Sequence, residues 1–151
     1  MLSSIRTRQS AFTLIELLVV MVVLVIIAAI AIPKFYSRGE QSKEAALHSD
    51  LTLVRNAIAS FQADTGYYPL KLSDLTATTS AGLSTANTGV DSTGAHQTIV
   101  ATTFHGPYVQ SVPNDPVSAK ALTYSVASPT VGNVTSSAAG NGQDGTAFST
   151  W

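Results

Sequence analysis

Hydrophobic and polar positions divide the chain into four parts. Residues 1–11 are polar and basic, with Arg6 and Arg8. The 21 residues from Phe12 to Ile32 carry a single charge, Glu16, and from Leu17 onward the run is uninterrupted: LLVVMVVLVIIAAIAI. A helix that spans the hydrocarbon core of a membrane needs about 20 apolar residues. This second part therefore predicts a membrane-spanning helix over residues 12–33.

The third part, residues 34–66, changes to an amphipathic pattern. Apolar residues recur at spacings of four, three, four and three, which is one face of a helix; they are Leu47, Leu51, Val54, Ile58 and Phe61. Asp64-Thr65-Gly66 supplies a stop, with Gly66 as the expected C-terminal cap. Pro33 and Gly39 are the weak points of a helix that continues through both parts, and Pro33 predicts a kink because it removes a backbone hydrogen bond.

Residues 67–151 contain short segments with strand patterns. Three are expected to form strands: Gln97–Phe104, residues 121–127 (ALTYSVA) and residues 145–151 (GTAFSTW). Asn141-Gly142 and Asp144-Gly145 are turn dipeptides that can reverse the chain into the last of them. The polar, low-complexity stretch near residues 75–95 is expected to be a surface loop. The predicted class is α+β: a long N-terminal helix packed against a small antiparallel β-sheet head at residues 67–151.

Composition excludes several functions. The formal net charge is −1 and there is no basic patch, so no nucleic-acid partner is expected. The chain has no cysteine, which excludes disulfides and thiolate metal sites. His48, His96 and His105 lack metal-ligand spacing, and no phosphate-binding Gly-rich loop is present. We therefore expect no enzyme activity, no catalytic residue and no firm metal site.

Glu16 allows three interpretations of the apolar segment. A cleaved secretory signal would end near Ala29–Ala31, and an uncleaved single-pass anchor would keep Glu16 at the membrane edge. In the third interpretation the chain is cut between Ala11 and Phe12. The new ammonium group then lies about one helical turn from Glu16, and carboxylate and amine can pair between staggered chains to set their register.

The stretch RTRQSAFTLIELLVV resembles the leader and helix start of type IV prepilins and type II secretion pseudopilins. This resemblance implies that a prepilin peptidase removes residues 1–11 and N-methylates Phe12. It also implies that Glu16, after Thr13, guides the addition of subunits. The family prefers Gly before the cut, where this chain has Ala11.

Two further segments, DTGYYP (Asp64–Pro69) and VPNDP (Val112–Pro116), resemble major pseudopilins. The expected function is a structural subunit of a pilus-like filament, most like a pseudopilin. A type IV pilin for adhesion, motility or DNA uptake is the alternative, and a non-polymerising anchored or secreted binding domain is the alternative of another class. The implied partners are the prepilin peptidase, copies of itself and other pilin-like subunits, an inner-membrane assembly platform and membrane lipid.

The resemblance also implies a location and one open cofactor. The location is the bacterial inner membrane, with a single pass and a head exported to the periplasm or cell surface. Major pseudopilins typically bind calcium in C-terminal loops. Here Asp115, Asp144 and Asn141 could supply oxygen ligands, although turn-forming aspartates are the more ordinary explanation.

Overall fold

A computed structural model describes residues 12–151, and nothing is described of the side chains of residues 33–37. Its main element is the helix α1, Leu14–Thr65, which is 52 residues long and includes the position of Pro33. It ends where the sequence predicts, because Gly66 has a φ of +80° and its N–H donates to the carbonyl oxygen of Gln62 at 2.8 Å. A left-handed residue after the last helical turn is favourable for glycine, which has no Cβ.

The chain divides into two compact units, residues 1–39 and residues 40–151, which we describe separately. In the first unit the apolar side chains of α1 are exposed, for example 86% for Leu14 and 48% for Val23. Leu14–Ile32 has a mean hydropathy of 3.3, so this part of α1 is long and apolar enough to cross a membrane.

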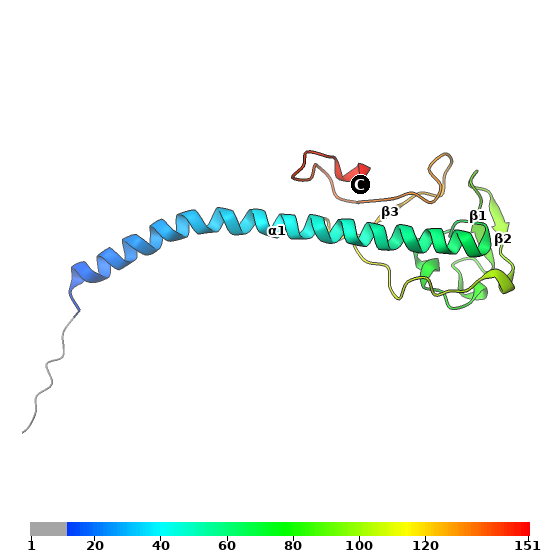
Figure 1. The fold of residues 1–151 in the computed structure, drawn as a ribbon, viewed down its shortest axis with the longest axis horizontal. Coiled ribbons are helices and arrows are strands. Elements are labelled where there is room, and N and C mark those ends of the chain that lie inside the picture. Colours follow the sequence, from blue (N-terminus) through cyan, green and yellow to red (C-terminus); the bar gives the residue numbers. More distant parts are fainter. Residues whose placement is uncertain (1–11) are drawn as a thin grey trace, which may run out of the picture. The chain divides into compact units, whose positions relative to one another are not determined.

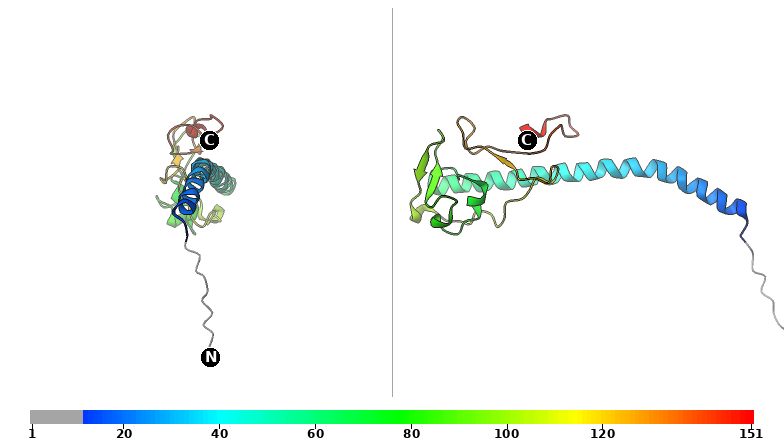
Figure 2. Two further views of the ribbon diagram at one scale, coloured as in Figure 1. Left: turned by 90° about the vertical axis from the view of Figure 1, so that its left-hand side faces the viewer. Right: turned by 180° about the vertical axis from the view of Figure 1, so that it is seen from behind.

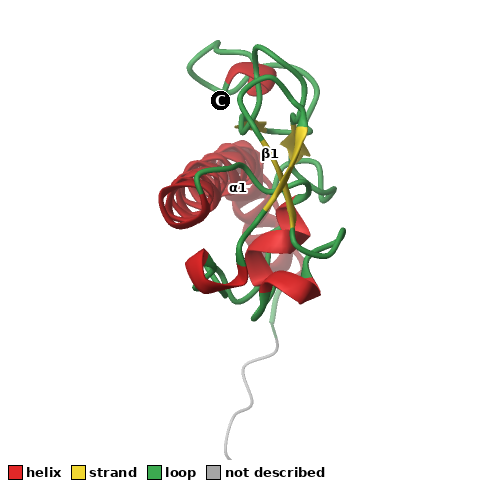
Figure 3. Ribbon diagram, turned by 90° about the vertical axis from the view of Figure 1, so that its right-hand side faces the viewer, coloured by secondary structure: helices red, strands yellow, loops and turns green. Residues whose placement is uncertain are grey.

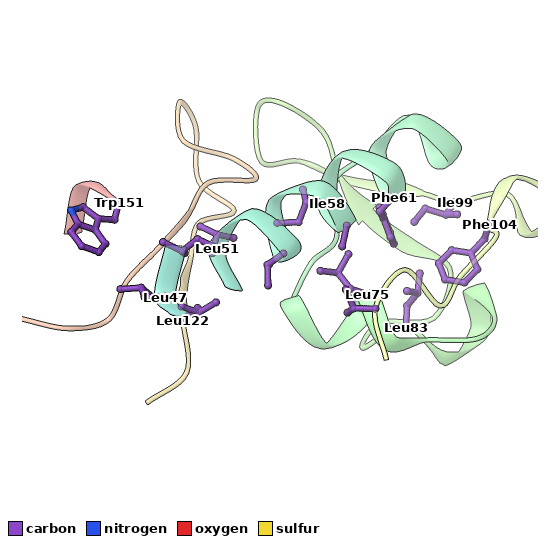
Figure 4. Close-up of a cluster of buried hydrophobic side chains, with 14 of the residues drawn as sticks. Leu47, Leu51, Ile58, Phe61, Leu75, Leu83, Ile99, Phe104, Leu122 and Trp151 are labelled. Carbon is purple, nitrogen blue, oxygen red and sulfur yellow. The ribbon is translucent and has the colours of Figure 1, made fainter. Parts of the chain in front are cut away.

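The second unit is built on the apolar stripe of α1. The five predicted stripe residues, Leu47, Leu51, Val54, Ile58 and Phe61, are each at most 4% exposed. Residues from the rest of the unit cover this stripe and complete the core (Figure 4); among them are Leu75, Leu83, Ile99, Phe104, Leu122, Val134, Phe148 and Trp151. The amphipathic period therefore identified the packing face correctly, since apolar residues every three or four positions share one side of a helix.

Two small antiparallel sheets accompany α1. Strand β1, Thr88–Val90, pairs with β2, His96–Thr98, with Gly89 opposite Gln97. Strand β3, Thr123–Tyr124, pairs with β4, Val134–Thr135. β1 and β2 lie beside the C-terminal end of α1 (Figure 1). These helices and strands confirm the predicted α+β class, with two two-stranded sheets in place of one.

Short 3₁₀ helices and loops form most of the remaining cover of α1 in this unit (Figure 3). The 3₁₀ helices are η1 (Leu72–Thr76), η2 (Ser80–Gly82), η3 (Ala101–Thr103) and η4 (Phe148–Thr150). At the opposite end of the unit from β1 and β2, the C-terminal segment runs beside α1, as the right-hand view of Figure 2 shows.

The polar stretch near residues 75–95 is more structured than predicted. It contains β1, and Leu83 within it is buried against the core. The buried carboxylate of Asp74 holds the stretch to the start of η1: its oxygens accept the N–H of Lys71 at 2.8 Å and the N–H of Ser84 at 2.7 Å. The expectation of a plain surface loop is therefore wrong for this part of the chain. Although the stretch is mostly polar, it contains two buried apolar residues, Leu83 and Val90.

The predicted strand at residues 145–151 is wrong. The turn before it forms as expected, since the N–H of Gly142 donates to the carbonyl oxygen of Thr146 and Gly145 has a φ of +83°. The chain then forms η4. In a strand, residues three apart point to opposite faces, whereas in a 3₁₀ helix they share one side. The 3₁₀ turn thus lets both Phe148 and Trp151 reach the core, with ring centroids 4.9 Å apart.

The predicted strand Gln97–Phe104 is correct only at its start. Pairing with β1 ends at Thr98, opposite Thr88. Beyond it the chain turns so that Ile99 and Phe104 are buried while Val100 between them is 60% exposed. The predicted strand at residues 121–127 is likewise correct only in part: Leu122 is buried between exposed neighbours, and strand β3 covers Thr123–Tyr124.

Candidate assembly site

The N-terminus of α1 is closed by a reciprocal pair of polar side chains, Thr13 and Glu16. The N–H of Glu16 donates to the hydroxyl oxygen of Thr13 at 3.3 Å. In return, the carboxylate Oε2 of Glu16 accepts the N–H of Thr13 at 3.3 Å and its hydroxyl at 3.2 Å. This is a capping box, in which the first helical residues satisfy each other's unpaired donors.

The capping box changes how Glu16 is understood. Isolated carboxylates are costly near lipid, and hydrogen bonds from a neighbouring hydroxyl and N–H offset part of that cost. The same bonds hold the carboxylate next to the start of the helix, close in sequence to Phe12. The sequence carries the signal for this contact, Thr-x-x-Glu before an apolar run, although the interpretation of Glu16 as a pairing group alone does not use it.

Of the other predicted site residues, the structure describes some and not others. Phe12 lies just before α1 and its side chain is 73% exposed. Ala11, on the other side of the predicted cut, lies outside the described residues. Pro33 lies within the helical span of α1, so its kink stays a prediction.

Asp115, one of the predicted calcium ligands, is a buried hydrogen-bond acceptor. Its Oδ1 accepts the N–H groups of Val117 and Ser118 at 2.8 and 3.1 Å. Its Oδ2 accepts the hydroxyl of Ser136 and the N–H groups of Ser137 and Ala138, the latter two at 2.9 and 3.2 Å. Burial by itself raises the pKa of Asp115, and the bonds from Ser136, Ser118, Val117 and Ser137 together bring it below its usual value.

These donors use the lone pairs that a metal would need. A carboxylate offers about four acceptor positions, and N–H and O–H groups already fill them at Asp115. Asp115 therefore does not fit a calcium ligand, and the alternative that it is a turn-forming residue agrees with the structure. Sequence reasoning missed the larger role, because Ser136–Ala138 are distant in sequence and carry no motif.

Asp144 and Asn141, the other two residues considered for calcium, make contacts within the turn at residues 141–147. Asp144 closes its own turn by accepting the N–H of Thr146 at 2.8 Å and its hydroxyl at 3.0 Å, and these bonds lower its pKa. Asn141 is exposed and pairs with Ala147 in an isolated bridge. Within residues 12–151, no three or more His, Cys, Asp or Glu side chains come together in a way that could hold a metal ion.

A further polar contact, between α1 and the C-terminal segment, has no sequence signature. The Nη2 atom of Arg55 donates to the carbonyl oxygen of Val134 at 2.8 Å and to the main-chain oxygen of Trp151. Nearby on α1, the carboxylate of Glu44 accepts the N–H of Gln143 at 3.0 Å. These contacts attach β4 and the C-terminal segment to the helix.

Comparison with known proteins gives a family match at the site just described. Residues 6–32 match the family described as the prokaryotic N-terminal methylation motif. Over 64 residues, the chain is 38% identical to type II secretion system core protein G of Pseudomonas aeruginosa and 31% identical to that of Aeromonas hydrophila. Each alignment covers 42% of this chain and 45% of the relative, so the chain matches less than half the length of these proteins.

No solved structure matches the chain. The matched motif contains Phe12, Thr13 and Glu16, the residues at which the structure places the capped start of an exposed apolar helix. Residues 6–32 therefore carry the prokaryotic N-terminal methylation motif, and part of the chain is similar to type II secretion system core protein G.

Proposed function

We propose that this protein is a structural subunit of a pilus-like filament of the type II secretion class, that is, a pseudopilin. The observation that carries the proposal is an apolar helical surface with a polar cap at one end. The large apolar side chains of Phe12–Ile32 are each 48% exposed or more, next to the hydrogen-bonded Glu16. Such a surface needs lipid before assembly and apolar neighbours after it.

The proposed sequence of events begins with the removal of residues 1–11 by a prepilin peptidase, between Ala11 and Phe12. The same enzyme methylates the new amino group of Phe12. The subunit waits in the inner membrane as a single-pass protein with its head in the periplasm. It then joins copies of itself and other pilin-like subunits at an assembly platform.

In this proposal Glu16 sets the register of each added subunit. Its carboxylate pairs with the Phe12 ammonium group of a neighbouring subunit, since an unpaired charge between apolar helices is heavily penalised. Thr13 holds the carboxylate in place until that pairing forms. The names of the two relatives favour a secretion pseudopilin over a type IV pilin.

The first experiment determines the N-terminus and intact mass of the protein extracted from membranes. A chain that starts at N-methylated Phe12 supports the proposal. A start near Ile32 would mean a secreted domain, and an intact Met1 in cells with active peptidase would mean a plain anchor. Either result contradicts the proposal.

A second experiment separates charge pairing from helix capping at Glu16. Glu16→Ala removes both, whereas Glu16→Gln keeps a hydrogen-bond acceptor and loses the charge. We expect both variants to insert in the membrane and neither to enter filaments. Glu40→Ala is the matched control, since it removes another α1 glutamate, which is 46% exposed and paired with Lys43. Normal filaments from Glu16→Gln would contradict the charge-pairing role.

A further inference from the structure

The C-terminal part of the head is joined to the rest by two charged groups of the chain itself, the Asp115 carboxylate and the Arg55 guanidinium. We propose that these two groups replace the calcium ion that major pseudopilins typically bind. The head of this protein therefore folds, and keeps its C-terminal segment docked, without calcium. This inference concerns the folded head and holds whether or not the chain forms filaments.

The first step of the argument is the carboxylate. Asp115 is fully buried, and it connects residues 117–118 with residues 136–138 through backbone N–H groups and the Ser136 hydroxyl. A calcium ion would have to displace several of these donors and leave them unpaired in a buried site. Because the polar side-chain atoms buried within residues 12–151 all have partners, the site needs no additional ligand.

The second step is the cation. Calcium in proteins commonly gathers carbonyl oxygens from separate loops. Here Arg55 gathers main-chain oxygens in the same way, because its guanidinium donates to the carbonyl oxygen of Val134 and to the main-chain oxygen of Trp151, which belong to different segments. The guanidinium is a planar cation with several N–H donors, and it is carried by helix α1. The protein thus places its own positive charge where the two segments meet.

The third step is the turn at residues 141–147, where a calcium loop would be expected. Each carboxylate oxygen of Asp144 there accepts a hydrogen bond from Thr146. The indole of Trp151 fills the space above Gly142, where a Cβ would lie only 2.4 Å from a ring atom. An aromatic ring therefore occupies the inner side of this turn.

The test uses the full chain, purified in detergent, with Trp151 as the reporter. Trp151 is the only tryptophan in the sequence and is 8% exposed, so its emission reports whether the C-terminal segment is docked. We expect the thermal midpoint and the emission maximum to be the same in millimolar calcium and in EGTA. A rise of the midpoint by several degrees in calcium, or measurable calcium binding by calorimetry, would overturn the proposal.

Variants test the assigned groups. Arg55→Met keeps the aliphatic stem and removes the cation; we expect a lower midpoint and a red-shifted emission, to the same extent in calcium and in EGTA. Lys43→Met is the matched control on the same helix, since it removes a cation from an exposed ion pair, and it should change neither reading. If Arg55→Met behaves like the control, or if calcium restores its emission, the role given to Arg55 is wrong.

Discussion

The imidazole of His48 lies face to face with the indole of Trp151, with ring centroids 4.1 Å apart and planes 17° from parallel. Trp151 also contacts Phe148 edge to face. This stack joins the middle of α1 to the C-terminal segment, next to the contact that Arg55 makes with the same residue. The aromatic stack and the Arg55 cation thus add to the hydrogen bond between Glu44 and Gln143 in holding the C-terminal segment on the helix.

The first prediction concerns the space that Trp151 occupies. Gly142→Ala places a Cβ 2.4 Å from the indole, so the ring must move off His48. We expect a red-shifted tryptophan emission and a lower thermal midpoint. Gly39→Ala is the control for the substitution itself: no atom lies within 4 Å of its Cβ, and alanine favours a helix interior by about 1 kcal/mol. Unchanged emission in Gly142→Ala would contradict the packing described here.

The second prediction compares two leucines on α1. Leu51 is 1% exposed and Leu53 is 50% exposed. Leu51→Ala leaves a cavity in the core and should lower the free energy of unfolding of the head by about 3 kcal/mol. Leu53→Ala should change it by less than about 1 kcal/mol. Denaturant unfolding measures both, and similar losses would mean that α1 presents a different face to the head.

The third prediction is an acid limit on stability set by carboxylates. The pKa of Asp115 is lower in the folded protein than its usual value, because hydrogen bonds to it outweigh burial, and Thr93 and Gln97 lower the pKa of Asp91 to about 2. A carboxylate whose pKa is lower in the folded than in the unfolded protein stabilises the fold at pH values above its unfolded pKa, which is near 4. That stabilisation is lost as the pH falls from about 4 toward 2. The thermal midpoint should therefore be level near neutral pH and fall below about pH 4.

Asp115→Asn provides the matching variant. The amide puts donors where the Ser136 hydroxyl and backbone N–H groups now donate, so we expect a loss of about 2 kcal/mol or more at neutral pH. Its midpoint should also fall less steeply in acid than that of the unchanged chain. An equally steep fall would assign the acid sensitivity to other carboxylates.

The fourth prediction concerns the capping box. Thr13→Val keeps the shape of the side chain and removes the hydroxyl, which should cost about 1 kcal/mol at the start of α1 and leave Glu16 less well held. Thr13→Ser keeps the hydroxyl. We expect fewer filaments from Thr13→Val than from Thr13→Ser at equal amounts of processed subunit. Equal yields would show that Glu16 acts without Thr13.

Local patterns were sufficient for the helix and its packing face. Three features could be predicted because each depends only on residues close together in the sequence. They are the apolar run, the three- and four-residue spacing of Leu47–Phe61 and the cap at Gly66. The turn at Gly142 and Gly145 was predictable for the same reason. The Thr13–Glu16 cap was also present as a local motif.

Contacts between distant segments were decided only by the tertiary structure. Residues 145–151 were expected to form a strand, yet they form a 3₁₀ turn in which Phe148 and Trp151 are both buried against the core. Asp115 was expected to be a turn residue or a metal ligand, and the structure brings Ser136–Ala138 against it. Arg55 carries no motif, and the structure pairs it with main-chain oxygens of Val134 and Trp151. The sequence by itself determined which face of α1 is buried and where α1 ends. The partners of each buried polar group depended on how the chain folds back, because a hydrogen bond between distant residues leaves no period in the sequence.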